Sequence, residues 1–392
     1  MTRIPIPEGS LFGKANLPYG VFSIPRQAPR VGVRVGGHVV DLSLALGDEV
    51  FAAGSLNPFM AQGYDRWVQV REAVSELAAG EVPAEAVVPV DQVSLHLPFD
   101  VGDYVDYYAS EHHATNLGRL FRPDQEPLTP NWKHLPVGYH GRSGTIIVSG
   151  VDFTRPSGQR KGPQDPVPVF GPSIRLDIEA EMGFVVGTGT EMGQPIPTED
   201  FDRHVFGAVI FNDWSARDLQ AWEYVPLGPY LGKSFASSLS PWVVPMLALD
   251  QAKVDTPTQD PTPLPYLKMD PPWGLDIDLA VLWNGQEVSR PPYREMYWSP
   301  AQMLAHMTVN GASTRTGDLF ASGTISGPEK HQRGAFIELT WGGQEPVTVN
   351  GQERTFLLDG DTIVISASAP GSGGQRIGFG EVRTTILPAP SL

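Results

Sequence analysis

The side chains best suited to chemistry are gathered in residues 104–142, a stretch with four histidines, several carboxylates and arginines, and a cluster of tyrosines. His112 and His113 are adjacent, and histidine, with an ordinary pKa of about 6.5, is the usual general base. If a helix has already begun at Asp106, then Asp106 and His113 lie on one face, two turns apart. That arrangement sets a candidate metal ligand beside a base. The alternative is a pair of surface histidines with no part in catalysis.

A second group of carboxylates lies in residues 174–187, where apolar and acidic residues alternate. Alternate residues of a strand share a face, so the pattern predicts apolar residues on one side and Asp177, Glu179 and Glu181 on the other. Like charges held this close repel each other unless a cation lies between them. The acidic face therefore indicates either a cation site or an ordinary solvent-exposed strand face.

Four carboxylates from three parts of the chain suit an oxygen-only site for a divalent cation: Asp106, Glu179, Glu181 and Asp213. Such ligands, in a chain without cysteine, favour Ca²⁺, Mg²⁺ or Mn²⁺ over zinc. Exposure to solvent is the alternative, since exposed carboxylates are the norm. Asp177, on the same predicted face, is left as a surface residue or an outer neighbour of the site.

A group of cations and amides follows Asp213. Arg217, Gln220 and Tyr224 recur at three- and four-residue steps, which on a helix gives one stripe, and Lys233 comes after a Gly-Pro turn. If they converge, these groups would stabilise a developing negative oxygen. The alternative is an amphipathic helix with a solvated polar face. No G-x-S-x-G or P-loop pattern is present, so a serine hydrolase or a phosphoryl-transfer enzyme has no support.

The composition indicates a globular protein with many turns. The chain has 392 residues, of which 41% are hydrophobic, with 42 glycines and 38 prolines. A formal net charge of −16 disfavours nucleic acid and anionic membranes as partners. The absence of cysteine excludes disulfides, thiolate metal sites and a cysteine nucleophile. Neither a signal peptide nor a membrane-spanning run is visible, so we expect a soluble cytoplasmic protein.

Strand patterns dominate the rest of the sequence. Two apolar runs around Gly36-Gly37 predict a hairpin, and residues 65–77 and 300–308 predict helices. Residues 79–89 have the composition of a linker, which suggests domains at 1–90 and 91–392. The string GAFIELTW, with Glu338, is typical of a strand. Hairpin turns are predicted at Asn350-Gly351 and Asp359-Gly360.

At these residues the sequence resembles the fumarylacetoacetate hydrolase family. The strings that carry the resemblance include DYVDYYASEHHATNLGRLFR, PNWKHLPVGYHGR, FNDWSARDLQAWEYVPLGPYLGKSF, FASGTISGPE and RTFLLDGDTIVI. It covers essentially the whole chain. The resemblance implies a mainly β (α+β) fold, with a small SH3-like N-terminal β-barrel domain and a large C-terminal β-roll domain, assembled as a homodimer.

The resemblance also implies an enzyme that hydrolyses a carbon–carbon bond of 4-fumarylacetoacetate, giving fumarate and acetoacetate in the last step of tyrosine and phenylalanine breakdown. It makes Asp106, Glu179, Glu181 and Asp213 the Ca²⁺ ligands. A structural Mg²⁺ would touch Asp213, Lys233 and Ser237, where Ser237 stands in place of an expected Thr.

Catalytic and substrate-binding roles follow from the same resemblance. His113 would activate water and Glu338 would orient it, while Arg217, Gln220 and Lys233 would form the oxyanion wall. The implied substrate contacts are Tyr108, Arg122, Tyr139, Gln220, Tyr224 and Thr324. His112 stands where a different polar residue is expected, and the His-Ala-Thr-Asn register favours His113 as the base.

Two alternative functions remain open from the sequence. One is a relative that hydrolyses acylpyruvates or decarboxylates oxaloacetate, against which the residues at positions 108, 122, 220 and 224 argue. The other is a non-catalytic β scaffold that binds metal. Such a scaffold would need the carboxylates, but it would not need His113, Glu338 and Lys233 together.

Overall fold

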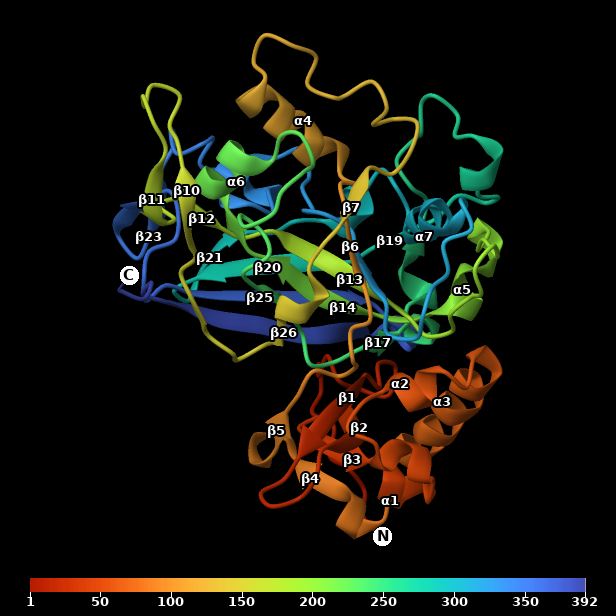
Figure 1. The fold of residues 1–392 in the computed structure, drawn as a ribbon. Helices are drawn as coiled ribbons and strands as arrows, with labels where there is room; N and C mark the ends of the chain where they lie inside the picture. Colours follow the sequence, from red (N-terminus) through yellow and green to blue (C-terminus); the bar gives the residue numbers. More distant parts are fainter. Residues whose placement is uncertain (392) are drawn as a thin grey trace.

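The computed structural model describes residues 1–391 and shows a small N-terminal domain packed against a much larger one, both built mainly from strands (Figure 1). The mainly β architecture expected from the sequence is confirmed. No helix within residues 1–391 has the length and apolarity needed to cross a membrane.

The N-terminal domain is one antiparallel sheet with helices beside it. Its strands run in the order β4-β3-β2-β1-β5. They are β1 (Tyr19–Ser23), β2 (Arg30–Val35), β3 (His38–Asp41), β4 (Val87–Pro89) and β5 (Ser94–Leu95). The accompanying helices are α1 (Leu42–Leu46), α2 (Asn57–Met60) and α3 (Tyr64–Ala79). Helix α3 forms because Trp67, Val70 and Val74 recur on one face and are buried there.

An aromatic cluster joins this domain to the larger one. The ring of Phe206, from the large domain, lies 5.3 Å from Tyr19, 5.6 Å from Phe59 and 5.4 Å from Trp67 between centroids. All four side chains are buried in a core that also contains residues of both domains. The two parts therefore share one continuous hydrophobic core at their junction.

The large domain contains two curved sheets. The eight-stranded sheet has the order β7-β6-β22-β13-β14-β16-β8, with β17 also on β14. Its strands are β6 (Tyr104–Tyr107), β7 (Gly138–His140), β8 (Ile146–Val148), β13 (Ala180–Val186), β14 (Val205–Asp213), β16 (Ser237–Leu239), β17 (Val244–Pro245) and β22 (Leu319–Ala321). Every residue of β13 and β14 is buried, as is typical of strands covered on both faces.

The five-stranded sheet lies against the first, with β25 and β26 next to β14 (Figure 1). It is made of β9 (Phe153–Thr154), β20 (Asp278–Trp283), β21 (Gln286–Ser289), β25 (Thr362–Pro370) and β26 (Arg376–Leu387). Two-stranded pairs complete the strands: β10 (Ser157–Arg160) with β11 (Val169–Pro172), β12 (Leu176–Asp177) with β15 (Ser215–Ala216), β18 (Lys253–Val254) with β19 (Gly274–Leu275), and β23 (Val347–Val349) with β24 (Gln352–Arg354).

Helices of the large domain are short and lie around the sheets. They are α4 (Glu111–Phe121), α5 (Phe201–His204), α6 (Arg217–Glu223), α7 (Pro300–Thr308) and α8 (Phe336–Leu339). Ser110 is the N-cap of helix α4. Its hydroxyl accepts a hydrogen bond from His113 N at 3.2 Å, which stabilises the first turn, where the two histidines lie.

Several predicted elements are confirmed. The hairpin around Gly36-Gly37 joins β2 to β3, and the hairpin at Asn350-Gly351 joins β23 to β24. The helices predicted near residues 65–77 and 300–308 are α3 and α7.

Three predictions are wrong. Residues 334–341 are not a strand, because Phe336–Leu339 form the helix α8. Asp359-Gly360 is a turn but not a hairpin, since β24 pairs with β23 and β25 pairs with β20 and β26. Residues 79–89 are not a free linker, because β4 pairs with β3. The domain boundary near residue 90 stays a prediction, and β5 beyond it still belongs to the N-terminal sheet.

The domain junction yields a stability prediction. Phe206→Ala removes the ring that touches three aromatic partners, and we expect it to lower the free energy of unfolding by about 3–5 kcal/mol. Urea denaturation followed by tryptophan fluorescence measures the change. Phe170→Ala is the control, because Phe170 is 64% exposed and its loss should change stability by no more than about 0.5 kcal/mol. Equal effects of the two substitutions would refute the shared core.

Candidate active site and metal centre

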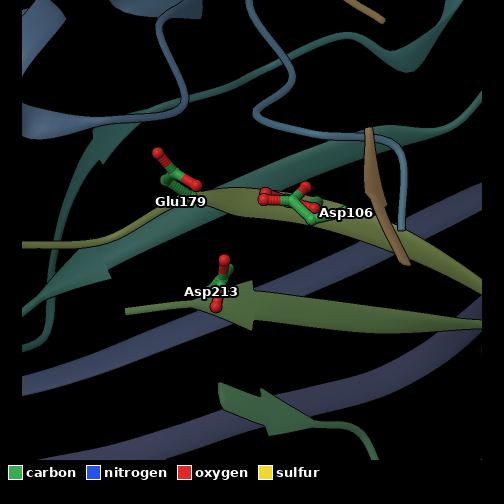
Figure 2. Close-up of side chains that lie close together, drawn as sticks. Asp106, Glu179 and Asp213 are labelled. Carbon is green, nitrogen blue, oxygen red and sulfur yellow. The ribbon is translucent and has the colours of Figure 1, made fainter. Parts of the chain in front are cut away.

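Four buried carboxylates converge at the end of the eight-stranded sheet. Asp106 is on β6, Glu179 lies between β12 and β13, Glu181 is on β13, and Asp213 ends β14. One carboxylate oxygen from each lies within 4.8 Å of the others. Figure 2 shows the side chains of Asp106, Glu179 and Asp213 close together around a common space.

The strand order explains the convergence. β6 pairs with β22, β22 with β13, and β13 with β14, so three distant parts of the sequence become neighbours. In this register Asp106 lies beside Ala321, and Glu181 lies beside Phe211, two residues before Asp213. The proposed alternative of a solvent-exposed acidic face is wrong, because all of these carboxylates are buried.

Two buried cations neutralise only part of this charge. Lys233 Nζ donates to a carboxylate oxygen of Glu179 and, at 2.9 Å, to Asp213. Arg217 Nη1 donates to Glu179 at 2.7 Å. Burial raises the pKa of Glu179, but Lys233 and Arg217 outweigh burial and hold that pKa at about 2. Glu179 is therefore fully ionised at neutral pH.

Asp106 and Glu181 lack such a partner. Burial and the neighbouring carboxylates raise the pKa of both groups well above the ordinary range. Asp106 Oδ1 and Glu181 Oε1 are buried and, among the residues that the structure describes, meet no hydrogen-bond donor. Unpartnered oxygens within an excess of negative charge fit a hard divalent cation, which would supply the missing charge.

Backbone geometry helps to hold Glu181 in place. Gly323 N donates to Glu181 Oε2 at 3.0 Å. Gly323 has a φ of +74°, and a Cβ atom at this position would lie 2.1 Å from the carbonyl oxygen of Tyr107. Only glycine can therefore bring this N–H group to the carboxylate.

His113 and Glu338 form a buried pair beside this cluster. His113 Nδ1 donates to Glu338 Oε2 at 2.6 Å. Asn116 Nδ2 and Ser326 Oγ also donate to the Glu338 carboxylate, at 2.9 and 3.0 Å. Burial raises the pKa of Glu338, but His113, Asn116 and Ser326 together bring that pKa below its ordinary value. Glu338 is thus ionised, and His113 Nε2 is the nitrogen left for other partners.

Arg217 and Gln220, two residues of the expected oxyanion wall, are in contact. Arg217 Nη1 donates to Gln220 Oε1 at 3.2 Å, and Nε donates to Asp177 at 2.8 Å. Arg217 Nη2 is buried and has no acceptor within residues 1–391. Arg217 and Lys233 bring two positive charges to Glu179, one at each carboxylate oxygen.

The predicted substrate contacts differ in how closely they approach His113 and the carboxylate cluster. The Tyr108 ring contacts the His113 ring edge-on, at 5.3 Å between centroids. Tyr139 pairs in register with Asp106, and Thr324 follows Gly323. Arg122 ends α4 and donates to Pro127 O at 2.9 Å.

Tyr224, Ser237 and His112 are the remaining candidates from the sequence. Tyr224 is 46% exposed at the end of α6. Ser237 donates to Asp213 at 2.7 Å. His112 points toward Glu295, with 3.7 Å between the nearest nitrogen and oxygen, rather than toward Glu338.

Some local predictions for the site need correction. Asp106 and His113 do not share a helix, because Asp106 is on β6 and the helix begins only at Glu111. Glu338 lies on a helical turn instead of a strand, because its neighbours' N–H groups bind a buried carboxylate. Sequence reasoning missed Asn116, although its position three residues after His113 on one helix could have indicated it. It also missed Ser326, for which the sequence offers no signal.

Comparisons with known proteins agree with this geometry. A family described as "Fumarylacetoacetate (FAA) hydrolase C-terminal" matches residues 104–387, and "Fumarylacetoacetase N-terminal" matches residues 15–98. The chain is 46% identical to fumarylacetoacetase of Homo sapiens over 99% of both chains. It is 41% identical to the Arabidopsis thaliana fumarylacetoacetase over 99% of this chain and 98% of the relative.

Solved structures show the same fold at low identity. A fumarylacetoacetate hydrolase from Exiguobacterium antarcticum has a TM-score of 0.59 at 18% identity, over 95% of this chain and 99% of that one. A maleylpyruvate hydrolase from Sphingobium has a TM-score of 0.56 at 16% identity, over 95% and 100% of the two chains.

The carboxylate cluster yields a prediction about metal content. Glu181→Ala removes an oxygen that otherwise has no partner, so we expect divalent-metal affinity to fall at least about tenfold. Elemental analysis after dialysis against a limiting free-metal buffer measures the bound metal per protein. Glu381→Ala, an exposed carboxylate elsewhere, should leave the metal content unchanged. Undiminished metal in Glu181→Ala would remove Glu181 from the site.

Proposed function

We propose that this chain, which belongs to the fumarylacetoacetate hydrolase family, hydrolyses a carbon–carbon bond of 4-fumarylacetoacetate to give fumarate and acetoacetate. One structural observation carries the proposal: a buried His113–Glu338 pair lies beside a four-carboxylate cluster and an arginine with a free buried nitrogen. A scaffold that only binds metal has no use for the buried pair.

His113 acts as the base toward water. Its Nδ1–H is engaged by Glu338, so Nε2 accepts the proton of a water molecule. The hydroxyl adds to the carbonyl carbon of the fumaryl group. The bond from that carbon to the neighbouring methylene breaks, and its electron pair passes to the acetoacetate fragment as an enolate. The proton held by His113 is returned, and the fragment leaves as acetoacetate. Glu338 stabilises the imidazolium that exists between these events.

Arg217, Gln220 and Lys233 stabilise the negative oxygens that form during this sequence. Donors that are already oriented gain most in a site without bulk water, because no reorganisation is needed as charge develops. Arg217 Nη2 is suited to this role, since its other nitrogens are already bonded to Asp177, Glu179 and Gln220.

The residues that would hold a cofactor are those of the buried cluster. Asp106, Glu179, Glu181 and Asp213 would hold Ca²⁺, which when bound supplies a Lewis acid for the diketone oxygens. We place a second cation, Mg²⁺, beside Asp213, Lys233 and Ser237. These three residues contact one another through hydrogen bonds to the Asp213 carboxylate.

Substrate contacts are proposed for Tyr108, Arg122, Tyr139, Tyr224 and Thr324, together with Gln220. Arg122 suits a substrate carboxylate, because a guanidinium can bind a carboxylate through two hydrogen bonds. The buried hydroxyls of Tyr139 and Thr324 have no hydrogen-bond partner within residues 1–391, so they are free to bind substrate oxygens. We further propose a cytoplasmic homodimer that takes part in tyrosine and phenylalanine breakdown.

Release of acetoacetate from fumarylacetoacetate by the purified, metal-loaded protein tests the function. The loss of the substrate's diketone absorbance and the appearance of equimolar fumarate and acetoacetate are the expected results. Turnover of acylpyruvates or oxaloacetate with no turnover of fumarylacetoacetate would contradict the proposal.

Glu338→Gln tests the role of the buried pair. Gln keeps the shape but loses the charge that stabilises the imidazolium, so we expect kcat to fall by a large part of the about 10²–10⁴-fold typical of general-base catalysis. The acid limb of the kcat/KM–pH profile should move to lower pH, because loss of an adjacent anion disfavours the protonated ring. Glu345→Gln, an exposed carboxylate paired with Lys330, is the control. Near wild-type kcat with an unmoved acid limb would exclude Glu338 from the mechanism.

Arg122→Ala tests the carboxylate contact. If the contact is equally good in the ground and transition states, we expect KM to rise about tenfold while kcat changes much less. Arg119→Ala, an exposed arginine on the same helix, should leave both constants unchanged. An unaltered KM in Arg122→Ala would remove this residue from the substrate site.

A further inference from the structure

Asp177 is a fully buried carboxylate whose two oxygens each accept two hydrogen bonds. Oδ1 accepts from Ile178 N at 2.8 Å and from Phe336 N at 2.7 Å. Oδ2 accepts from Ile337 N at 3.0 Å and from Arg217 Nε at 2.8 Å. Asp177 is 0% exposed, and within residues 1–391 these four groups are the hydrogen-bond donors to its carboxylate.

One of these bonds sets the orientation of Arg217. The guanidinium plane is defined by Nε on Asp177 and by Nη1 on Glu179 and Gln220. With those nitrogens fixed, Nη2 is the one left without an acceptor among the residues described. Asp177 therefore decides which nitrogen of Arg217 is free to meet a developing negative oxygen.

Two other bonds hold the helix that carries Glu338. The donors Phe336 N and Ile337 N are the first N–H groups of α8, which have no partner within a helix. A helix of four residues has no stability of its own, since one turn costs more backbone entropy than its bonds return. A buried negative charge at its N-terminus supplies what the helix lacks. Glu338 is the third residue of this turn, so its position depends on Asp177.

We propose that Asp177 is a positioning residue that couples the two halves of the site: it orients the oxyanion donor Arg217 and, through α8, the Glu338 partner of His113. The inference rests on the proposed function for its kinetic consequences. The coupling itself is a property of the fold and has a test of its own.

The chain provides a matched control in its N-terminal domain. Asp41 is also 0% exposed, accepts from Arg30 Nε, and caps a short helix by accepting from Ser43 N at 3.0 Å and Leu44 N at 3.3 Å. Asp41 therefore has the same kinds of partner as Asp177, an arginine Nε and the first N–H groups of a short helix, but it lies in the N-terminal domain. Asp41→Asn should therefore reproduce the structural cost of losing such a carboxylate without its catalytic cost.

Asp177→Asn is the first test. Asn replaces one acceptor oxygen with an NH₂ group, which must face either Ile178 N–H and Phe336 N–H or Ile337 N–H and Arg217 Nε–H. We expect kcat per folded, metal-loaded enzyme to fall about 10- to 100-fold, the range typical when an outer partner of a site residue is lost. KM should stay within about threefold, because the lost interactions matter mainly in the transition state. Asp41→Asn should leave both constants at the wild-type level. A kcat in Asp177→Asn equal to that of Asp41→Asn would overturn the proposal.

Double-mutant cycles test whether the effect passes through the two named partners. Asp177→Asn should cost much less in an Arg217→Met or a Glu338→Gln background than in the wild type, because the group that it positions is already gone. If Asp177→Asn lowers kcat by the same factor in both backgrounds as in the wild type, a positioning role is contradicted.

Amide hydrogen exchange tests the coupling without substrate and without altering Asp177. Arg217→Lys removes the Nε–H group, so Asp177 loses one of its four donors. We expect exchange at residues 336–339 to speed up at least about threefold in this variant, as local opening of α8 becomes easier. Unchanged exchange there would overturn the coupling, whether or not fumarylacetoacetate proves to be the substrate. Inactivity of the wild type toward fumarylacetoacetate, with the exchange effect present, would instead overturn only the proposed function.

Discussion

The site depends on a concentration of negative charge inside the protein. Five buried carboxylates, Asp106, Asp177, Glu179, Glu181 and Asp213, face only two buried cations, Lys233 and Arg217. Burying a charge is costly unless it is paired, and burial raises the pKa of the two carboxylates that are left over. A divalent cation held by these carboxylates would balance the excess of negative charge. Three of the four carboxylates of the metal cluster lie on the fully buried strands β6, β13 and β14.

The same charges are divided between binding and positioning. Glu179 bonds to Arg217 and Lys233, which keeps its own pKa low and holds both cations against the cluster. Asp177 bonds to the opposite edge of Arg217 and to the start of α8. Asp177 and Glu179 thus bind Arg217 from two sides. Because they occupy Nε and Nη1, the remaining nitrogen, Nη2, is the one left for another partner. These bonds fix the orientation of Arg217 before a substrate binds. Donors that are already oriented need no reorganisation as charge develops in the transition state.

The fold supplies these positions through strand order rather than through proximity in sequence. β6 and β22 run parallel, as do β16 and β8, so residues far apart in the chain enter one sheet beside β13 and β14. The second sheet, with β25 and β26, covers β14 from the other side, which excludes water from the base of the site. The N-terminal domain shares a core with the first sheet through Phe206 and its aromatic neighbours.

The sequence alone determined the elements whose signals are local. Periodic apolar residues predicted α3, and the Gly-Gly and Asn-Gly turns predicted two hairpins. The residues of the site were also visible as candidates, because few other stretches combine histidines, carboxylates and cations. Their grouping was visible only by resemblance to a family, since nothing local links Glu338 to His113, 225 positions away.

Tertiary structure decided what local propensity could not. GAFIELTW has the composition of a strand, yet Asp177 binds two N–H groups of this segment and makes it a helical turn. The acidic face of residues 177–181 has the pattern of a surface, yet Glu179 and Glu181 are buried and bond to Arg217, Lys233 and Gly323 N from distant segments. Both outcomes have the same physical reason. Hydrogen bonds and charge pairs between distant segments, formed inside the protein where water cannot compete, are stronger than the conformational preferences of a few neighbouring residues.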